Sequence, residues 1–249
     1  GDWSSDVCSS DLKSRSITSA FSMSINTGDK IALIGEEGNG KTTFLKTLLG
    51  TQSDNFKVKL EIGPGNIIFG LVKQSIVGDE LELSFLEYVL ENDWSLYGDL
   101  KATTNEVLNH LEEIDFDRKL SSFSNGELVR IQIVKLLLKE VDCFLMDEPS
   151  NDLDLDSILW LEAWLQYQSK PIIMVSHDRR LIQNFANRIL HFEQTHRKTK
   201  SVVTIFEGSY DDYVESRGLL ISKHNQNHSN AVKEKKKQEP SRPTGNKSP

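Results

Sequence analysis

Residues 124–149 read SNGELVRIQIVKLLLKEVDCFLMDEP, and this stretch decides the fold. A short Ser/Gly motif, Ser124 to Glu127, stands at the head of a helical pattern. The helix is followed by an apolar strand pattern that ends in two carboxylates, Asp147 and Glu148. Such a strand is typical of enzymes that bind a nucleotide together with magnesium. The Ser/Gly motif is much less common among nucleotide-binding folds, and it indicates a chain that works as one half of a pair.

A glycine-rich motif near the amino end supports a nucleotide site. Residues 35–42 read GEEGNGKT, the P-loop pattern, and they lie between an apolar strand and a helix. The glycines let backbone N–H groups converge on phosphate oxygens, and the helix directs its positive end at the same anion. Glu36 and Glu37 take the variable positions, where side chains can point outward. The predicted ATP-binding residues are Gly35, Gly38, Asn39, Gly40, Lys41, Thr42 and Thr43.

Polar residues after three apolar strands complete the predicted chemistry. We predict that Lys41 neutralises the β and γ phosphates of ATP, and that Mg²⁺ is held by Thr42, Gln74 and Asp147. Glu148 is predicted to act as general base on the attacking water, or at least to polarise it. His177, after the strand Ile172–Val175, is predicted to contact the γ-phosphate or that water. A strand that merely ends in solvated acids is the alternative, and the P-loop upstream argues against it.

Strand and helix patterns alternate along the chain, which predicts an α/β sandwich with a helical insertion from about Ser75 to Ser121. The predicted strands are Phe21–Ile25, Lys30–Ile34, Lys57–Ile62, Ile67–Val72, Asp142–Met146, Ile172–Val175, Ile189–Phe192 and Val202–Phe206. The predicted helices are Lys41–Leu49, Leu83–Glu91, Glu106–Ile114, Gly126–Glu140, Leu155–Tyr167 and Arg179–Phe185.

Composition narrows the class of protein. The 249 residues suffice for one sizeable core, and no apolar run approaches the ~20 residues of a membrane span. Two cysteines exclude a disulfide framework, and Cys143 in an apolar run is expected to be buried. No secretory signal pattern is present, and a reducing cytoplasm is the expected location.

Charge is distributed unevenly between the body and the carboxyl end. Residues 223–249 carry seven Lys and Arg against two Asp and Glu, a net charge of +5. The first 222 residues carry 22 against 35, a net charge of −13. Bulk charge therefore excludes the body as a nucleic-acid binder, whereas the tail is either a solvated charged segment or a phosphate-binding one.

Both ends read as non-globular. Gly1 to Leu12 is rich in Ser and Asp, lacks periodicity and resembles a translated adapter sequence. We expect this segment to be non-native or disordered and leave it out of the fold. Pro240 to Lys247 has the composition of a linker, so we expect the native chain to continue.

The order of these motifs resembles the ABC-type ATPases, from about Lys13 to Arg217. Within that superfamily, residues 147–154, DEPSNDLD, resemble the DEPTNHLD motif of the ABC-F branch, and residues 175–179, VSHDR, match its VSHDR. Residues 206–213, FEGSYDDY, resemble the GNYSxY stretch that leads into that branch's interdomain linker. The signature departs from LSGGQ or LSGGE, since Phe123 replaces Leu and Asn125 replaces the first Gly. Asp152 stands where the branch has His.

The resemblance implies an ABC-type P-loop fold, with a mixed, mostly parallel sheet core, an antiparallel β portion and a helical subdomain at about 75–140. It implies an ATPase domain at 13–208 and the start of an interdomain linker at 209–249, a helix followed by a basic tail. Two such domains close over two ATP molecules. Ser124, Gly126 and Glu127 would therefore contact a nucleotide on a second domain, either the missing half of the same protein or a homodimer mate. Asp154 would belong to the D-loop.

For function, the resemblance implies ATP hydrolysis with Mg²⁺, weak in an isolated domain, and action on the ribosome or its RNA through the linker. Translation regulation and ribosome protection against antibiotics both occur in the branch, and no membrane subunit is expected. Two other classes stay open at this point. One is the ATPase subunit of a membrane transporter, and the other is a nucleotide-binding regulator that does not hydrolyse ATP.

Overall fold

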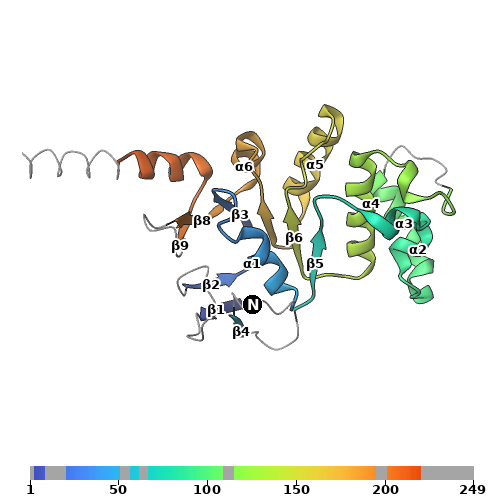
Figure 1. The fold of residues 1–249 in the computed structure, drawn as a ribbon, viewed down its shortest axis with the longest axis horizontal. Coiled ribbons are helices and arrows are strands. Elements are labelled where there is room, and N and C mark those ends of the chain that lie inside the picture. Colours follow the sequence, from blue (N-terminus) through green and yellow to red (C-terminus); the bar gives the residue numbers. More distant parts are fainter. Residues whose placement is uncertain are drawn as a thin grey trace, which may run out of the picture. The chain divides into compact units, whose positions relative to one another are not determined.

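The computed structural model describes residues 3–8, 21–50, 57–61, 67–108, 115–194 and 201–219 of the chain. The chain divides after Tyr210 into two units. The first unit contains both sheets and the helices α1–α6 (Figure 1). In the second unit, residues 211–219 are helical, and the predicted basic tail lies outside the described residues.

The larger sheet has six strands in the order β5-β6-β7-β3-β8-β9. Five neighbouring strands are parallel, and β9 runs antiparallel to β8 at the edge. This arrangement confirms the predicted mixed sheet core with an antiparallel portion. The strands are β3 (Lys30–Gly35), β5 (Phe69–Val72), β6 (Cys143–Asp147), β7 (Ile172–Val175), β8 (Arg188–Gln194) and β9 (Ser201–Glu207).

A smaller antiparallel sheet has the order β2-β1-β4. It consists of β1 (Trp3–Cys8), β2 (Phe21–Ile25) and β4 (Lys57–Glu61). The strand β1 lies within Gly1 to Leu12, the segment expected to be non-native or disordered. The main chain of β1 hydrogen-bonds to β2 on one side and to β4 on the other. Such pairing does not require the apolar periodicity that the segment lacks.

Helix α1 (Lys41–Leu48) lies between the two sheets (Figure 1). Its buried side chains Phe44, Leu45 and Leu48 share one core with Met23 and Ile25 of β2 and with the facing side of the larger sheet. Side chains alternate along β6, so Cys143 and Leu145 face this core while Phe144 faces the opposite side. There the Phe144 ring meets Trp164 of α5 edge-on, with ring centroids 5.3 Å apart.

Helices α5 (Leu155–Tyr167) and α6 (Arg179–Phe185) pack against each other on that opposite side. Both helices have the bounds predicted from the sequence, as do β2 and β7. Cys143 is buried, as predicted, and burial raises the pKa of its thiol. The described parallel strands thus carry helices on both faces, the layering expected of an α/β sandwich.

A helical region follows β5 and leads back to β6. It contains the short 3₁₀ turns η1 (Gly78–Glu82), η2 (Trp94–Leu96) and η3 (Leu120–Ser122), and the helices α2 (Phe85–Leu90), α3 (Tyr97–Leu108) and α4 (Asn125–Leu138). Helix α3 begins at Tyr97, which corrects the predicted start at Glu106. The strong α3–α4 packing explains the earlier start, because contacts distant in sequence override a weak local pattern. Across the part of the chain that the structure describes, no helix combines the length and apolarity that a bilayer crossing requires.

Candidate functional site

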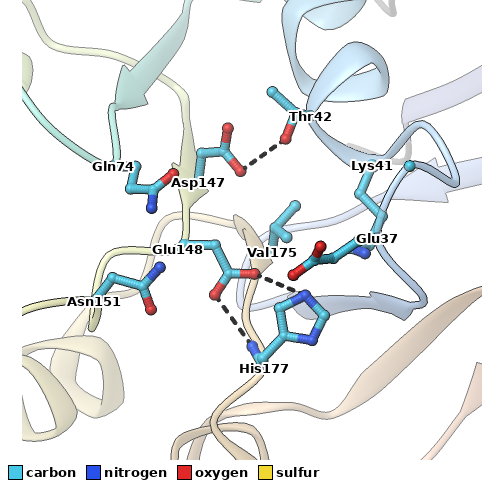
Figure 2. Close-up of a pocket in the computed structure, with 10 residues that line it drawn as sticks. Glu37, Lys41, Thr42, Gln74, Asp147, Glu148, Asn151, Val175 and His177 are labelled. Carbon is cyan, nitrogen blue, oxygen red and sulfur yellow. Dashed lines mark hydrogen bonds and ion pairs between the residues drawn. The ribbon is translucent and has the colours of Figure 1, made fainter.

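A cavity of about 240 Å³ opens at the carboxyl edge of the larger sheet. In the sheet register Asp147 of β6 lies opposite Val175 of β7, and Val175 lies opposite Leu33 of β3, which leads into the P-loop. Parallel strands therefore end together here, as in other α/β folds that bind ligands at this edge. The cavity is lined by Glu37, Gly38, Lys41, Thr42, Gln74, Asp147, Glu148, Asn151, Val175 and His177 (Figure 2).

The P-loop wraps the amino end of α1 with three glycines at positive φ, Gly35, Gly38 and Gly40. Lys41 is buried, and its Nζ donates to the carbonyls of Gly35 and Glu36 at 2.7 and 2.9 Å. Burial lowers the pKa of Lys41, and the carboxylates of Glu148, Glu37 and Asp147 oppose that shift. The ammonium thus rests on main-chain carbonyls, which an anion can replace.

Not every predicted P-loop residue lines the cavity. The Asn39 side chain is buried, and its Nδ2 donates to the carbonyl of Phe192 in β8 at 2.9 Å. That hydrogen bond fixes the loop to the sheet. Gly35, Gly40 and Thr43 shape or follow the loop outside the cavity lining, where their backbone positions the residues that do face it.

A set of oxygen atoms on one side of the cavity suits a hard cation. The hydroxyl of Thr42 donates to Oδ1 of Asp147 at 3.1 Å, and the amide of Gln74 faces the same space (Figure 2). Burial raises the pKa of Asp147, and the hydrogen bond from Thr42 opposes the shift. A hydroxyl, a carboxylate and an amide oxygen are ligands that Mg²⁺ accepts, so the residues present fit this ion.

Glu148 and His177 form a pair at the base of the cavity. The backbone N–H of His177 donates to Oε2 of Glu148 at 3.2 Å, and His177 Nε2 lies 3.3 Å from Oε1 (Figure 2). Burial raises the pKa of Glu148, although His177 and Lys41 act in the opposite direction. The backbone of Glu148 is left-handed, with φ of 49°, and it is held by a hydrogen bond from its N–H to the Val175 carbonyl at 2.9 Å. A strained backbone of this kind is common where a side chain must be presented to a ligand.

Ser124, Gly126 and Glu127 lie apart from this cavity, at the amino end of α4. Ser124 and Glu127 form a capping box, in which the Ser124 hydroxyl accepts from the Glu127 N–H at 3.3 Å and the Ser124 N–H donates to Glu127 Oε2 at 2.7 Å. The hydroxyl also donates to the same carboxylate at 3.0 Å. The motif therefore satisfies itself within the chain.

The same helix end packs closely on the start of α5. A Cβ on Gly126 would stand 2.0 Å from Ser157 Oγ and 2.7 Å from Ser157 Cβ, so only glycine fits. Two of the three departures from the family pattern are in contact, since Asn125 Nδ2 donates to the carbonyl of Asp152 at 3.4 Å. Asp154 caps α5 by accepting from the Ser157 N–H at 2.8 Å, and hydrogen bonds from the Ser157 side chain and backbone lower the pKa of Asp154.

Two polar residues that line the cavity, and one residue outside the lining, were not predicted from the sequence. The Glu37 side chain lines the cavity, although the variable P-loop position that it takes allows a side chain to point outward. Asn151 lines it from the turn after Glu148, and its position in the DEPSNDLD stretch was the available signal. Gln132 was overlooked although it is an amide between apolar neighbours, Ile131 and Ile133; it is buried and hydrogen-bonds to Lys73, the neighbour of Gln74.

Comparison with known proteins now adds to this geometry. The family model described as ABC transporter matches residues 18–151, more than half of the chain. The chain belongs to the ABC transporter family. A solved ABC transporter of metal-chelate type, in an inward-facing conformation, aligns with TM-score 0.58 at 22% identity over 76% of each chain. That likeness shows the fold alone.

The curated relatives of this ABC domain are of the ABC-F type, which confirms the resemblance seen in its motifs. It is 33% identical to the probable ATP-binding protein YbiT of Escherichia coli O157:H7, over 78% of this chain and 36% of YbiT. It is 34% identical to the ATP-binding protein Uup-like of Haemophilus influenzae, over 79% of this chain and 43% of that protein. It is 28% identical to ABC transporter F family member 5 of Arabidopsis thaliana, over 81% of this chain and 34% of that protein. The chain thus spans between a third and a half of the length of these relatives.

Proposed function

We propose that this ABC domain binds ATP with Mg²⁺ in the cavity at the sheet edge and hydrolyses it to ADP and phosphate. The observation that carries the proposal is the convergence of three separate segments on one cavity. Lys41 and Thr42 come from the P-loop helix, Asp147 and Glu148 from the end of β6, and His177 from the end of β7. No single segment would indicate hydrolysis, whereas together they supply a cation for phosphate, oxygen ligands for a metal and a base.

The roles follow from the contacts. Lys41 exchanges its main-chain carbonyl partners for the β and γ phosphates, since an anion pairs better with a buried ammonium than neutral carbonyls do. Thr42, Asp147 and Gln74 would hold Mg²⁺, which neutralises phosphate charge when it is bound. Positive φ in the P-loop turns successive N–H groups toward the same phosphates.

Glu148 is the proposed general base. Burial raises the pKa of its carboxyl, so the carboxylate accepts a proton from water more readily than a solvated one does. His177 holds both oxygens of Glu148, one through its backbone N–H and one through its ring, and this fixes the direction of the carboxylate. The same ring, half-exposed to the cavity, can contact the γ-phosphate.

We also propose that a second ABC domain completes the reaction. Ser124, Gly126 and Glu127 lie outside this chain's own cavity, and Asp154 lies exposed beside them. The amino end of α4 carries a positive partial charge suited to a phosphate held elsewhere. Turnover by this chain alone is therefore expected to be slow and to rise more than linearly with protein concentration. Rapid turnover that is independent of concentration would contradict this part of the proposal.

A ribosomal role is the finer proposal, as a translation factor or as a protection factor against antibiotics. It is supported by the ABC-F type of the relatives and by the net charge of +5 over residues 223–249. Basic segments bind RNA phosphates with an affinity that falls steeply with salt. Co-sedimentation with ribosomes at low and high salt, with and without residues 223–249, tests this separately from hydrolysis.

The test of the ATPase proposal compares Glu148→Gln with the exposed carboxyl variant Glu106→Gln. We expect Glu148→Gln to keep ATP affinity within about threefold and to slow phosphate release by ~100-fold or more, the scale of a general base. Lys41→Ala should weaken ATP binding by about 100-fold or more. Unchanged phosphate release in Glu148→Gln, with Glu106→Gln behaving as wild type, would overturn the assignment of the base.

A further inference from the structure

Gln132 occupies an unusual place for an amide. It lies on α4, two turns after Ser124, on a helix whose other buried side chains are Leu128, Val129, Ile131, Ile133, Val134, Leu136 and Leu138. Only 3% of its surface is exposed. A buried amide requires hydrogen-bond partners, because losing water without replacement is costly.

Both partners of Gln132 belong to one residue. The Lys73 N–H donates to Oε1 of Gln132 at 2.8 Å, and Nε2 of Gln132 donates to the Lys73 carbonyl at 3.3 Å. Lys73 follows β5 and directly precedes Gln74, whose amide lines the cavity. Two hydrogen bonds from one planar group to both sides of a residue fix its backbone direction more firmly than one bond would.

Close packing holds α4, the helix that carries Gln132, against β5, the strand that precedes Lys73. Leu136 lies one turn after Gln132 on the same face of α4. A Cβ on Gly70 of β5 would stand 2.7 Å from Leu136 Cδ2 and 2.8 Å from Val141 Cγ1, so the strand and the helix approach as closely as only glycine allows. Gly70 and Lys73 are thus held by one helix through an apolar and a polar contact.

We infer that Gln132 is a positioning residue for Gln74, and that it joins this part of the cavity to the helix that carries Ser124. The inference rests on the proposed function for the role of Gln74 toward Mg²⁺, and on geometry alone for the hold on Lys73. The amide of Gln132 sets the Lys73 backbone, and the Lys73 backbone sets where the Gln74 side chain enters the cavity. Neither Gln132 nor Lys73 lines the cavity itself.

The first experiment measures the hold on Lys73 without nucleotide. Amide hydrogen exchange of the Lys73 N–H is compared in wild type, Gln132→Leu and Glu80→Gln. Glu80 is the matched control because it pairs with the Lys73 side chain, at 2.7 Å from Nζ, and not with its backbone. We expect Gln132→Leu to speed exchange by about tenfold or more while Glu80→Gln changes it little. Equal exchange in all three proteins overturns the inference. If the Leu variant does not fold, Gln132→Met replaces it, since Met is unbranched and similar in length.

The second experiment measures the consequence for the metal. ATP affinity is measured with excess Mg²⁺ and with a chelator for wild type, Gln132→Leu, Gln74→Ala and the double variant. We expect Gln132→Leu to reduce the gain in ATP affinity that Mg²⁺ provides by about 3–10-fold. The ATP affinity measured in the presence of the chelator should not change. The double variant should match Gln74→Ala, because Gln132 acts through Gln74. Additive losses, or an equal loss with chelator, contradict the inference.

The two experiments separate this inference from the proposed function. If wild type gains no ATP affinity from Mg²⁺, the proposed metal site fails, and hydrogen exchange still decides whether Gln132 holds Lys73. If wild type gains affinity and Gln74→Ala loses it while Gln132→Leu does not, the metal site stands and the positioning role of Gln132 is wrong.

Discussion

The cavity at the sheet edge and the amino end of α4 are built in opposite ways. The cavity collects charged groups from three segments, and several of them carry pKa values shifted by burial. At the end of α4, Ser124 and Asn125 are exposed, Gly126 is buried, and Ser124 and Glu127 satisfy each other in a capping box. The cavity therefore holds charged groups at a cost of burial, whereas the helix end satisfies its own polar groups.

This difference matches what each region is proposed to do. A site that binds its own nucleotide with a metal keeps excess carboxylate charge, which a cation such as Mg²⁺ can neutralise, and that charge costs stability in the free protein. A surface that contacts a nucleotide on another domain must stay folded when that domain is absent, and a capped helix end is stable by itself. The comparison predicts that substitutions in the two regions change stability with opposite signs.

The largest expected effect is on the helix end. Gly126→Ala places a methyl group 2.0 Å from Ser157 Oγ and 2.7 Å from its Cβ, so α4 and α5 must separate. Overpacking of this kind costs about 1–3 kcal/mol, more than the gain of up to ~1 kcal/mol from removing a helical glycine. We expect the melting temperature of the nucleotide-free protein to fall by about 2–8 °C.

Two variants sharpen this test. Asn125→Ala, at the neighbouring exposed position, should change the melting temperature by less than about 2 °C. Ser157→Gly in the Gly126→Ala background removes both clashing atoms and should restore part of the loss. If Gly126→Ala has the same melting temperature as wild type, the end of α4 is not packed as tightly as its contact with α5 indicates.

The next effect concerns the charge in the cavity. Glu37 lines the cavity beside Lys41, where its carboxylate repels a triphosphate. We expect Glu37→Gln to tighten ATP binding by about 3–10-fold at low salt, and by less at high salt because ions screen the repulsion. Glu36→Gln is the matched control, since the Glu36 side chain does not line the cavity, and it should change affinity less than about twofold. Equal gains from both variants would mean that loop charge in general, and not the place of Glu37, limits binding.

Most of the sheet could be predicted, because its strands are short apolar runs with turn residues on either side. The predicted cluster at the sheet edge followed from one rule, that parallel strands end together, and the structure brings Lys41, Thr42, Gln74, Asp147, Glu148 and His177 to one cavity. The start of α3 and the strand β1 could not be predicted, since both depend on partners distant in sequence. The direction of the Glu37 side chain and the hydrogen-bond partners of Gln132 could not be predicted either, because they also depend on segments distant in sequence. A local pattern states that a side chain is polar, but it does not state which backbone the fold brings within reach.

The smallest expected effect gives the most direct test of whether substitutions in the cavity and at the capped helix ends change stability in opposite directions. Burial raises the pKa of Glu148, so the folded protein holds that proton more tightly than the unfolded chain, and stability falls as pH rises above the ordinary carboxyl range. Hydrogen bonds from Ser157 lower the pKa of Asp154, so its charged form stabilises the fold, and that contribution is lost as pH falls. In thermal unfolding without nucleotide at pH 7.5, we expect Glu148→Gln to raise the melting temperature by about 2 °C, a gain that disappears near pH 4. Asp154→Asn should give no gain at pH 7.5. Two results would contradict the distinction between the cavity and the capped helix ends. One is a higher melting temperature for Asp154→Asn at pH 7.5, and the other is a higher melting temperature for Glu148→Gln that persists at pH 4.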